Sequence, residues 1–247
     1  QEADGGSATM DDGNGGSIDM LREKGAVRRQ LGYLPQDFGV YPKVSAEDLL
    51  NHFAVLKGLV ARGARKDTVE GLLRQVNLWD ARKRKLGTYS GGMRQRFGIA
   101  QALLGQPRLV IVDEPTAGLD PEERNRFLNL LAEIGENVAV ILSTHIVEDV
   151  TDLCEAMAIM NKGQVLLTGR PADAIAALEG QVWRRRIGKA ELPEYQARHQ
   201  VLSSRLVGGQ PVIHVFSADD PGDGFERIDA GLEDVYFQRL RTQQKAA

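Results

Sequence analysis

Asp113 and Glu114 are adjacent carboxylates that directly follow the apolar run Leu109 to Val112. Because this run is short, apolar and mostly β-branched, we expect a strand that is buried on both faces. Ligands of open α/β sheets collect at the carboxyl ends of the strands. There, one acid can hold Mg²⁺ while the other orients or deprotonates an attacking water. Taken alone, the pair fits a turn or a helix cap equally well.

His145 is predicted to lie on the same edge of the sheet as the two acids. It follows a second apolar run, 138–142, and a helix is predicted between the two runs. A strand, a helix and a strand in this order predict a right-handed crossover and a parallel sheet. The helix begins with Asp120 as its cap and Pro121 at its first position. Taken alone, a histidine in this place is as often structural as functional.

Ser90, Gly91 and Gly92 open another predicted helix, whose apolar positions recur at helical spacing. Ser90 is a good cap, but glycines in a first turn are poor helix formers, each costing up to about 1 kcal/mol relative to alanine. Bare backbone N–H groups at the positive end of a helix let an anion approach closely. The segment therefore predicts a phosphate-binding helix start, and the plainer alternative is a glycine-rich turn.

The composition is that of an ordinary globular protein, with 42% hydrophobic and 26% charged residues in a chain of 247. This length is enough for one large domain, or for one domain and a small appendage. The net charge of −3 gives no basic field, so we expect no nucleic-acid partner. A single cysteine, Cys154, excludes an intrachain disulfide and fits a reducing compartment. No apolar run approaches the roughly 20 residues that span a bilayer, and no signal peptide is visible.

Two helices are predicted between the strand at 31–34 and Ser90. Gln36 follows the predicted strand 31–34, and taken alone it is an ordinary loop residue. Ser45 caps the next helix. The apolar side of that helix is predicted to carry Leu49, Leu50, Phe53, Leu56 and Val60. A second helix is predicted at 67–76. The basic run 82–85 is interpreted as a solvated surface, with contact to phospholipid or RNA as the sharper alternative.

The two ends of the chain carry weaker signals. The amino end is rich in glycine and polar residues, and it predicts turns around a short strand at 7–10. Two strands are predicted around a turn at 161–163, followed by a short helix at 171–178. The composition changes after this helix, and we interpret 180–247 as a small α+β appendage with a final helix at 231–240.

Together the motifs resemble those of the ATP-binding cassette (ABC) ATPases. In the order of that family they are a Q-loop (33–36), the signature motif (89–96), the Walker B strand with its glutamate (109–114), the D-loop (117–120) and the switch histidine (His145). Tyr89 stands where the family usually has leucine, and Met93 stands where it usually has glutamine. Neither departure changes the serine or the glycines of the signature.

The resemblance implies an α/β fold with a parallel sheet core like that of P-loop NTPases and a helical signature subdomain at about 44–104. It also implies a partial ABC ATPase domain at 1–179, followed by a small C-terminal accessory region at 180–247.

The resemblance further implies ATP and Mg²⁺ as cofactors. Glu114, His145 and Gln36 would then be catalytic: Glu114 would act on the attacking water, His145 would contact the γ-phosphate, and Gln36 would couple the site to a partner. Asp113 and Gln36 would hold the metal. Such a division of roles suits phosphoryl transfer, which needs mainly positioning and charge stabilisation.

The nucleotide-binding residues implied by the resemblance are Ser90, Gly91, Gly92 and Asp120. They would act on ATP that is held by the opposing cassette of a dimer, with Asp120 placed at the dimer interface. Hydrolysis would then depend on closure of the dimer.

One departure from the family is serious, because no G-x-x-x-x-G-K-[ST] occurs in the chain. The stretch 12–17 is rich in glycine but lacks the lysine that grips the β- and γ-phosphates. The family places this loop before the Q-loop, so we expect an amino-terminally truncated sequence that begins at Gln1. We expect the polypeptide alone to bind ATP weakly and to hydrolyse it negligibly, and its full-length parent to be an ATPase.

The resemblance favours the motor subunit of an ABC transporter, and the segment 231–237 favours export. The implied partners are a second ABC ATPase subunit, identical or different, and an integral membrane permease, with the chain held peripherally at the cytoplasmic face of the membrane. Two alternatives stay open: a non-transport ABC ATPase that acts on ribosomes or DNA, and a non-catalytic regulatory fragment. The transported substrate is not encoded in this chain.

Overall fold

The computed structural model describes residues 4–12, 15–36, 39, 41–222 and 224–246. The chain divides into two compact units, an amino-terminal unit of Gln1–His145 and a carboxy-terminal unit of Ile146–Ala247. The predicted boundary between residues 179 and 180 falls inside the second unit, and the domain assignment of 146–179 stays a prediction. Among the described residues, no helix is both long enough and apolar enough to cross a bilayer.

The centre of the amino-terminal unit is a parallel sheet of three strands in the order β3 (Leu31–Leu34), β4 (Leu109–Asp113) and β5 (Ala139–Ser143). The register pairs Leu34 with Val112, and Asp113 with Ser143. All three strands therefore end at one edge of the sheet. This confirms the predicted α/β class and its parallel sheet.

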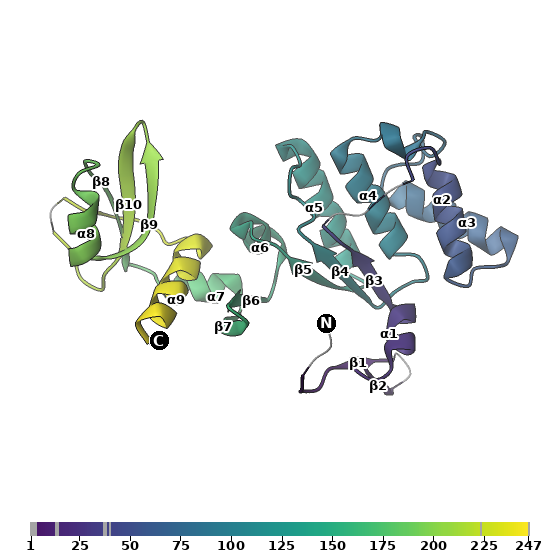
Figure 1. Cartoon of the computed structure of the whole chain (residues 1–247), viewed down its shortest axis with the longest axis horizontal. Coiled ribbons are helices and arrows are strands. Elements are labelled where there is room, and N and C mark those ends of the chain that lie inside the picture. Colours follow the sequence, from purple (N-terminus) through teal and green to yellow (C-terminus); the bar gives the residue numbers. More distant parts are fainter. Residues whose placement is uncertain (1–3, 13–14, 37–38, 40, 223, 247) are drawn as a thin grey trace. The chain divides into compact units, whose positions relative to one another are not determined.

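Helices α4 (Gly91–Ala102) and α5 (Pro121–Gly135) lie over this sheet (Figure 1). Val110 and Val112 are completely buried. Gly32 permits close packing, because a Cβ there would lie 3.0 Å from the carbonyl carbon of Ala102 in α4. The core of this layer is therefore the strand face that α4 and α5 cover.

The other face of the sheet is only partly covered, so the prediction that 109–112 is buried on both faces is wrong. Burial along β4 alternates between buried and half-buried residues. Ile141 in β5 is 53% exposed, and Tyr33 in β3 is 51% exposed. An unbroken apolar run indicates a strand, but it does not show which of the two faces finds a packing partner.

A helical subdomain contains α2 (Ala46–Leu56), α3 (Arg62–Gln75) and a short 3₁₀ turn, η1 (Leu86–Thr88). Ser45 caps α2 as predicted, accepting a hydrogen bond from the Asp48 backbone N–H at 3.1 Å. The helix predicted at 67–76 begins earlier, at Arg62, and ends at Gln75.

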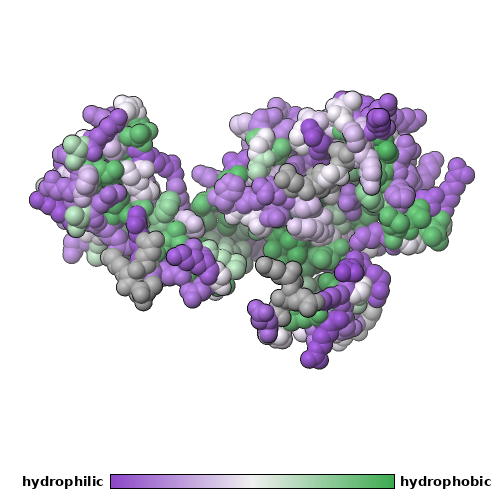
Figure 2. All heavy atoms as spheres, viewed as in Figure 1, coloured by the Kyte–Doolittle hydropathy of each residue, from purple (hydrophilic) through white to green (hydrophobic). Residues whose placement is uncertain are grey.

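Two residues that were assigned to the buried side of the first helix are instead on the surface. Leu56 is 69% exposed and Val60 is 74% exposed, whereas Leu49 and Leu50 are buried. Figure 2 shows hydrophobic spheres on this part of the surface, over α2 and α3. The α2 helix ends at Leu56, so the helical spacing used in the prediction does not extend to Val60.

The segment before the sheet forms an antiparallel hairpin of β1 (Thr9–Asp11) and β2 (Ser17–Asp19), followed by α1 (Lys24–Gln30). The strand predicted at 7–10 overlaps β1, and β2 was missed. The glycine-rich composition indicated only turns, and the pairing of Met10 with Ile18 places one apolar residue of each strand opposite the other.

The carboxy-terminal unit begins with α6 (Val147–Leu153), the hairpin β6 (Met157–Asn161) and β7 (Gln164–Gly169), and α7 (Pro171–Ala176). The predicted hairpin is confirmed. Its turn places Lys162 and Gly163 at φ angles of 48° and 75°, which is the left-handed conformation that tight hairpin turns require.

A four-stranded antiparallel sheet follows in the order β11-β8-β10-β9. Its elements, with the helices beside them, are β8 (Val182–Arg186), α8 (Leu192–Arg198), β9 (Gln200–Val207), β10 (Gln210–Phe216), β11 (Glu226–Arg227) and α9 (Leu232–Ala246). One apolar cluster joins Val182, Leu202 and Val235, and another joins Tyr195, Ile213 and Phe225. The region 180–247 therefore has the predicted α+β content.

Candidate functional site

Asp113, Glu114 and His145 gather at the carboxyl edge of the parallel sheet, as their positions after the strands predict. Asp113 ends β4 beside Ser143, the last residue of β5. The Glu114 backbone N–H then donates to the Ser143 carbonyl at 2.8 Å, which extends the ladder by one residue. Gln36 lies two residues after the end of β3, the strand that pairs with β4 on the side away from β5. Gln36 is exposed.

Glu114 and His145 are in direct contact. The Nδ1 atom of His145 lies 2.6 Å from Oε2 of Glu114. The Glu114 side chain is 18% exposed and that of His145 is 73% exposed, so the carboxylate is the sheltered partner. Among the described residues no hydrogen bond of regular geometry reaches this buried Oε2 atom. A carboxylate oxygen so placed can accept a hydrogen bond from the imidazole or from a bound molecule.

The backbone of Glu114 is also unusual, because its φ angle is +46°. Residues other than glycine rarely adopt this left-handed conformation, and the strain costs about 1–3 kcal/mol. Strained residues of this kind cluster at functional sites, where the surrounding structure holds them in place. At Glu114 the hydrogen bond to Ser143 and the contact with His145 both hold the residue.

Asp113 and Gln36 supply the oxygen atoms that Mg²⁺ prefers. Mg²⁺ is usually held by one or two carboxylates, with phosphate oxygens and waters completing its octahedron. Across the described ranges, no group of three or more His, Cys, Asp or Glu side chains could hold a metal by itself.

The start of α4 brings Ser90, Gly91 and Gly92 together at a helix amino terminus. The Ser90 hydroxyl accepts a hydrogen bond from the Met93 backbone N–H at 3.2 Å, so it caps the helix as predicted. The two glycines differ in their surroundings. A Cβ on Gly91 would have an ordinary contact at 3.8 Å with Leu119, whereas a Cβ on Gly92 would overlap the carboxylate of Glu123.

Glu123 is a residue of this site that the sequence did not reveal. It lies in the first turn of α5, and its Oε2 atom is 3.3 Å from Nη2 of the buried Arg96 in α4. Arg126 pairs with the other carboxylate oxygen at 3.1 Å. The Nε atom of Arg96 donates to the Gly92 carbonyl at 3.4 Å. The absence of a side chain at Gly92 thus makes room for the packing of α4 against α5. It also leaves the backbone open to an approaching anion.

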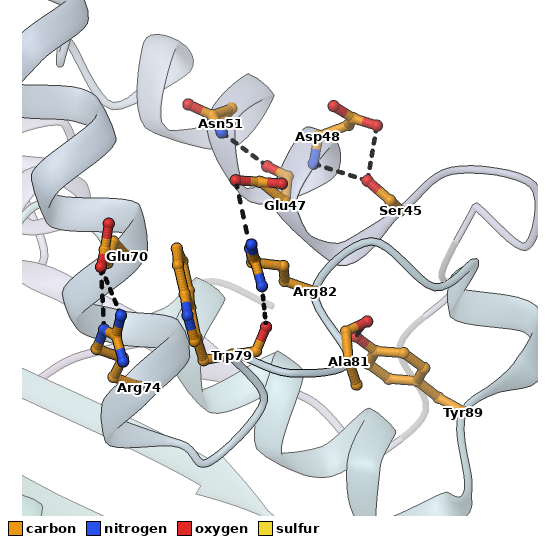
Figure 3. Close-up of polar contacts among 10 residues, drawn as sticks. All are labelled: Ser45, Glu47, Asp48, Asn51, Glu70, Arg74, Trp79, Ala81, Arg82 and Tyr89. Carbon is orange, nitrogen blue, oxygen red and sulfur yellow. Dashed lines mark hydrogen bonds and ion pairs between the residues drawn. The ribbon is translucent and has the colours of Figure 1, made fainter.

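The signature segment is anchored to the helical subdomain by the loop that precedes it. Tyr89 is 3% exposed, and its hydroxyl donates to the Ala81 carbonyl at 2.9 Å (Figure 3). Burial raises the pKa of Tyr89, and nearby Arg84 lowers it in part. The tyrosine that replaces the family's usual leucine therefore adds a hydrogen bond to the loop.

The basic run 82–85 is exposed at Lys83, Arg84 and Lys85, as interpreted, and only Arg82 is partly buried. Figure 3 shows Trp79 between Arg82 and Arg74, whose guanidinium carbons lie 3.8 Å and 4.4 Å from the ring centroid. Arg82 also pairs with Glu47 of α2 at 3.9 Å. Arg84 donates to the Thr88 carbonyl at 3.0 Å. These arginines stabilise the loop before the signature.

Asp120 caps α5, as predicted. Its Oδ1 atom accepts a hydrogen bond from the Glu123 backbone N–H at 2.9 Å, and Pro121 occupies the first position of the helix. The carboxylate remains exposed. Gly118 has a φ of +74°, which permits the turn into this helix.

The sequence-predicted residues therefore form two groups within the amino-terminal unit. The first lies at the sheet edge: Gln36, Asp113, Glu114 and His145. The second lies at the first turns of α4 and α5: Ser90, Gly91, Gly92 and Asp120. The signals for Glu123 and Arg96 were their spacings, three residues after Asp120 and four residues after Gly92, which place them one helical turn onward.

A sequence model of the ABC transporter family matches residues 2–117. The uncharacterised ABC transporter ATP-binding protein YxlF of Bacillus subtilis is 39% identical over 239 residues, covering 90% of this chain and 80% of that protein. The linearmycin resistance ATP-binding protein LnrL of Bacillus subtilis is 34% identical over 160 residues, covering 64% and 51%. The probable multidrug ABC transporter ATP-binding protein YbhF of Escherichia coli is 33% identical over 236 residues, covering 94% and 39%.

The chain thus spans four fifths of YxlF but less than two thirds of LnrL and of YbhF. The identity with YxlF extends across both units, and the ordered motifs lie on the predicted parallel sheet and its helices. Because sequence and fold agree in this way, we conclude that the chain belongs to the ATP-binding proteins of the ABC transporter family.

Proposed function

We propose that the chain is the nucleotide-binding subunit of an ABC transporter, in which Mg-ATP binding and hydrolysis are coupled to transport. The observation that carries the proposal is the contact of 2.6 Å between Glu114 and His145, directly beside Asp113 at the carboxyl edge of the sheet. This arrangement places a carboxylate, a histidine and a second acid at one edge of the sheet. Phosphoryl transfer to water requires such a positioned set.

Each residue at the edge has a separate task in this proposal. Glu114 orients the attacking water and accepts its proton at the carboxylate, while His145 contacts the γ-phosphate and holds Glu114 in place. Asp113 and Gln36 would hold Mg²⁺, which would neutralise part of the negative charge on the β- and γ-phosphates. The strained backbone of Glu114 supports the proposal because it fixes the direction of the carboxylate before substrate binds.

The second group of residues is proposed to act on the nucleotide of an opposing subunit. The Ser90 hydroxyl and the backbone N–H groups of Gly91 and Gly92 form a helix start that favours a phosphate. The exposed carboxylate of Asp120 is available to a partner across the interface. A composite site of this kind makes hydrolysis depend on the approach of two subunits.

We further propose that the transport partner is an integral membrane permease and that the subunit works at the cytoplasmic face of the membrane. The loop after Gln36, as far as the exposed Tyr41, is proposed to touch this partner. Export is the proposed direction, because LnrL is named for linearmycin resistance and YbhF for multidrug transport.

The polypeptide of 247 residues is proposed to need a phosphate loop from elsewhere. Its sequence has no glycine-rich loop with the lysine that grips the β- and γ-phosphates. We expect the purified polypeptide to bind ATP weakly and to show negligible Mg²⁺-dependent turnover. Turnover by the purified chain at the rate of an ordinary ABC ATPase would contradict this part of the proposal.

The function is tested by capturing the tagged chain with its partners from detergent-solubilised membranes of its own cells. We expect a membrane permease and a cassette subunit in the complex, and Mg²⁺-dependent ATP turnover by it. Glu114→Gln, made in a version of the chain that carries a phosphate loop, should lower the turnover of the complex at least a hundredfold while ATP binding is retained. Glu133→Gln, which alters an exposed glutamate of α5, is the matched control and should leave turnover unchanged.

Capture with ribosomes or DNA in place of a permease would reject the transport function. Equal turnover in the Glu114→Gln and Glu133→Gln complexes would instead reject the assignment of Glu114, whichever partner is found.

A further inference from the structure

Glu123 is a carboxylate of the amino-terminal unit that the proposed ATP chemistry does not use. It lies in the first turn of α5, where its backbone N–H donates to the Asp120 cap at 2.9 Å. Its side chain reaches the first turn of α4, because a Cβ built on Gly92 would overlap Oε2 of Glu123. One carboxylate thus lies at the starts of two helices, whose positive dipole ends both attract its charge.

Two arginines hold this carboxylate in place. Its Oε2 atom lies 3.3 Å from Nη2 of Arg96 in α4, and its Oε1 atom accepts a hydrogen bond from Nη1 of Arg126 at 3.1 Å. The side chains of Glu123 and Arg96 are only 18% and 10% exposed. Solvent and salt therefore screen the pair of Glu123 and Arg96 far less than an ion pair on the open surface.

Arg96 closes the connection back to the helix start. Its Nε atom donates to the carbonyl of Gly92 at 3.4 Å, so Gly92 contacts the arginine and also lies against the glutamate that pairs with it. Gly91 and Gly92 hold a helical turn poorly by themselves, since glycine is among the poorest helix formers. The place of the first turn of α4 consequently depends on the contacts that Glu123 and Arg96 supply.

We propose that Glu123 is a positioning residue for the phosphate-binding start of α4, which it ties to the Asp120 turn so that both are presented to a second subunit together. The inference rests on the proposed function, in which the starts of α4 and α5 act on the nucleotide of an opposing subunit. Glu123 itself does not contact the nucleotide in this proposal, and it acts through Arg96 and Gly92. Its effect on the rate is large, because a group displaced by about 1 Å can slow a reaction about a hundredfold.

The test removes the ion pair without leaving a buried charge behind. Loss of one partner alone would strand the other, whereas uncharged residues of similar size usually preserve stability. The double variant is therefore Arg96→Met with Glu123→Gln, and urea unfolding of the full chain checks that it stays folded. Glu123→Asp is a second variant, which keeps the charge but withdraws the carboxylate by one methylene. Glu122→Gln is the matched control, because Glu122 is the preceding residue, is 75% exposed and also pairs with Arg126, at 2.5 Å.

The first measurement follows the backbone amide signals of Gly91 and Gly92 by NMR in the full chain, without nucleotide. A Cβ on Gly91 would contact Leu119 and not Glu123, so the Gly91 signal reports displacement of the helix start and not the altered side chain itself. We expect the Gly91 signal to shift in the double variant, to shift less in Glu123→Asp and to stay in place in Glu122→Gln.

The second measurement is ATP turnover by the captured complex, with each variant made in a version of the chain that carries a phosphate loop. The double variant should lower kcat about tenfold and change KM for ATP less than twofold, because the phosphate loop of the opposing subunit holds the ground state. Glu122→Gln should change either constant less than twofold.

The proposal is overturned if the Gly91 signal of the double variant keeps its wild-type position, or if the kcat of the double variant equals that of Glu122→Gln. Failure of the proposed function is recognised separately. Glu114→Gln would then leave turnover unchanged, while the Gly91 signal still decides whether Glu123 places the helix start.

Discussion

Gly91 and Gly92 are neighbours in sequence, yet the fold uses them differently. A Cβ on Gly91 would have only an ordinary contact, 3.8 Å from Leu119, so packing does not require glycine there. Gly92 faces the Glu123 carboxylate, which is held in turn by Arg96 and Arg126. At the residue scale, packing therefore requires glycine at position 92 but not at position 91.

Substitution of each glycine separates these roles. Gly92→Ala should destabilise the chain by about 1–3 kcal/mol, because the new Cβ displaces Glu123 from its place beside Arg96. Gly91→Ala, the control, should change stability by less than about 1 kcal/mol and in the favourable direction of helix propensity. Urea unfolding followed by circular dichroism measures both. Equal effects would show that the Glu123 contact is not what requires glycine at position 92.

Tyr89 offers a second residue-scale prediction. Tyr89→Phe removes the hydrogen bond to the Ala81 carbonyl and should cost about 1 kcal/mol, since that carbonyl still accepts from the Arg84 backbone N–H at 2.8 Å. The pKa of Tyr89 is raised, chiefly by burial. The folded state therefore keeps the phenolic proton more tightly than the unfolded state does.

This stabilisation is complete below the ordinary tyrosine pKa and is lost as the pH rises through the folded-state value. The difference in unfolding free energy between the wild type and Tyr89→Phe should consequently shrink at alkaline pH. Urea titrations of both proteins between neutral and alkaline pH check the sign. A difference that grows with pH would contradict the assigned direction of the pKa.

At the scale of elements, helix α5 connects the two groups of site residues. It begins directly after the loop that leaves Glu114, and its first turn carries both the Asp120 cap and Glu123. Glu123 contacts the first helical turn of α4 through Gly92 and Arg96. The starts of α4 and α5 are thus fixed to each other, so a displacement of one helix is transmitted to the other.

The cap of α5 can be tested separately from its proposed role at an interface. Asp120→Ala should cost about 1 kcal/mol, because the Glu123 N–H loses its acceptor. Asp120→Asn preserves an acceptor of similar quality and should keep nearly full stability. Thermal unfolding compares the two variants. If Asp120→Asn keeps the stability but the captured complex loses ATP turnover, the carboxylate has a role beyond the cap. If Asp120→Ala and Asp120→Asn lose stability equally, the charge of Asp120, and not its cap hydrogen bond, stabilises the helix.

At the scale of the whole molecule, the two units have separate hydrophobic cores. The amino-terminal core includes Phe97 and Phe127 around the parallel sheet, and the carboxy-terminal clusters centre on Val182 and Ile213. Units with separate cores are able to unfold separately. The candidate ATP residues all lie in the first unit.

The chain has two tryptophans, one in each unit, which makes this independence measurable. Trp183→Phe leaves Trp79 as the reporter of the first unit, and Trp79→Phe leaves Trp183 as the reporter of the second. We expect fluorescence-detected urea transitions with different midpoints in the two variants. Coincident midpoints, equal to that of the wild type by circular dichroism, would show a single cooperative unit.

The sequence by itself determined the elements that depend on local rules. The caps Ser45, Ser90 and Asp120 each bond to a backbone group three residues onward, so their spacing was sufficient to place the helix starts. The apolar run before Asp113 was long enough to indicate a strand, and the order of the elements was sufficient to predict a parallel sheet. The meeting of Asp113, Glu114 and His145 at one edge followed from that topology.

Only the tertiary structure decided which side of each element is covered and which groups meet across elements. Leu56 is exposed although the helical spacing assigned it to the apolar side of its helix. The Glu123 carboxylate at Gly92, the pairing of Arg82 with Glu47 and the hydrogen bond from Glu114 to Ser143 all arise from contacts between parts distant in the sequence. The physical reason is that periodicity and capping are short-range, whereas burial, ion pairing and strain depend on what the rest of the chain brings alongside.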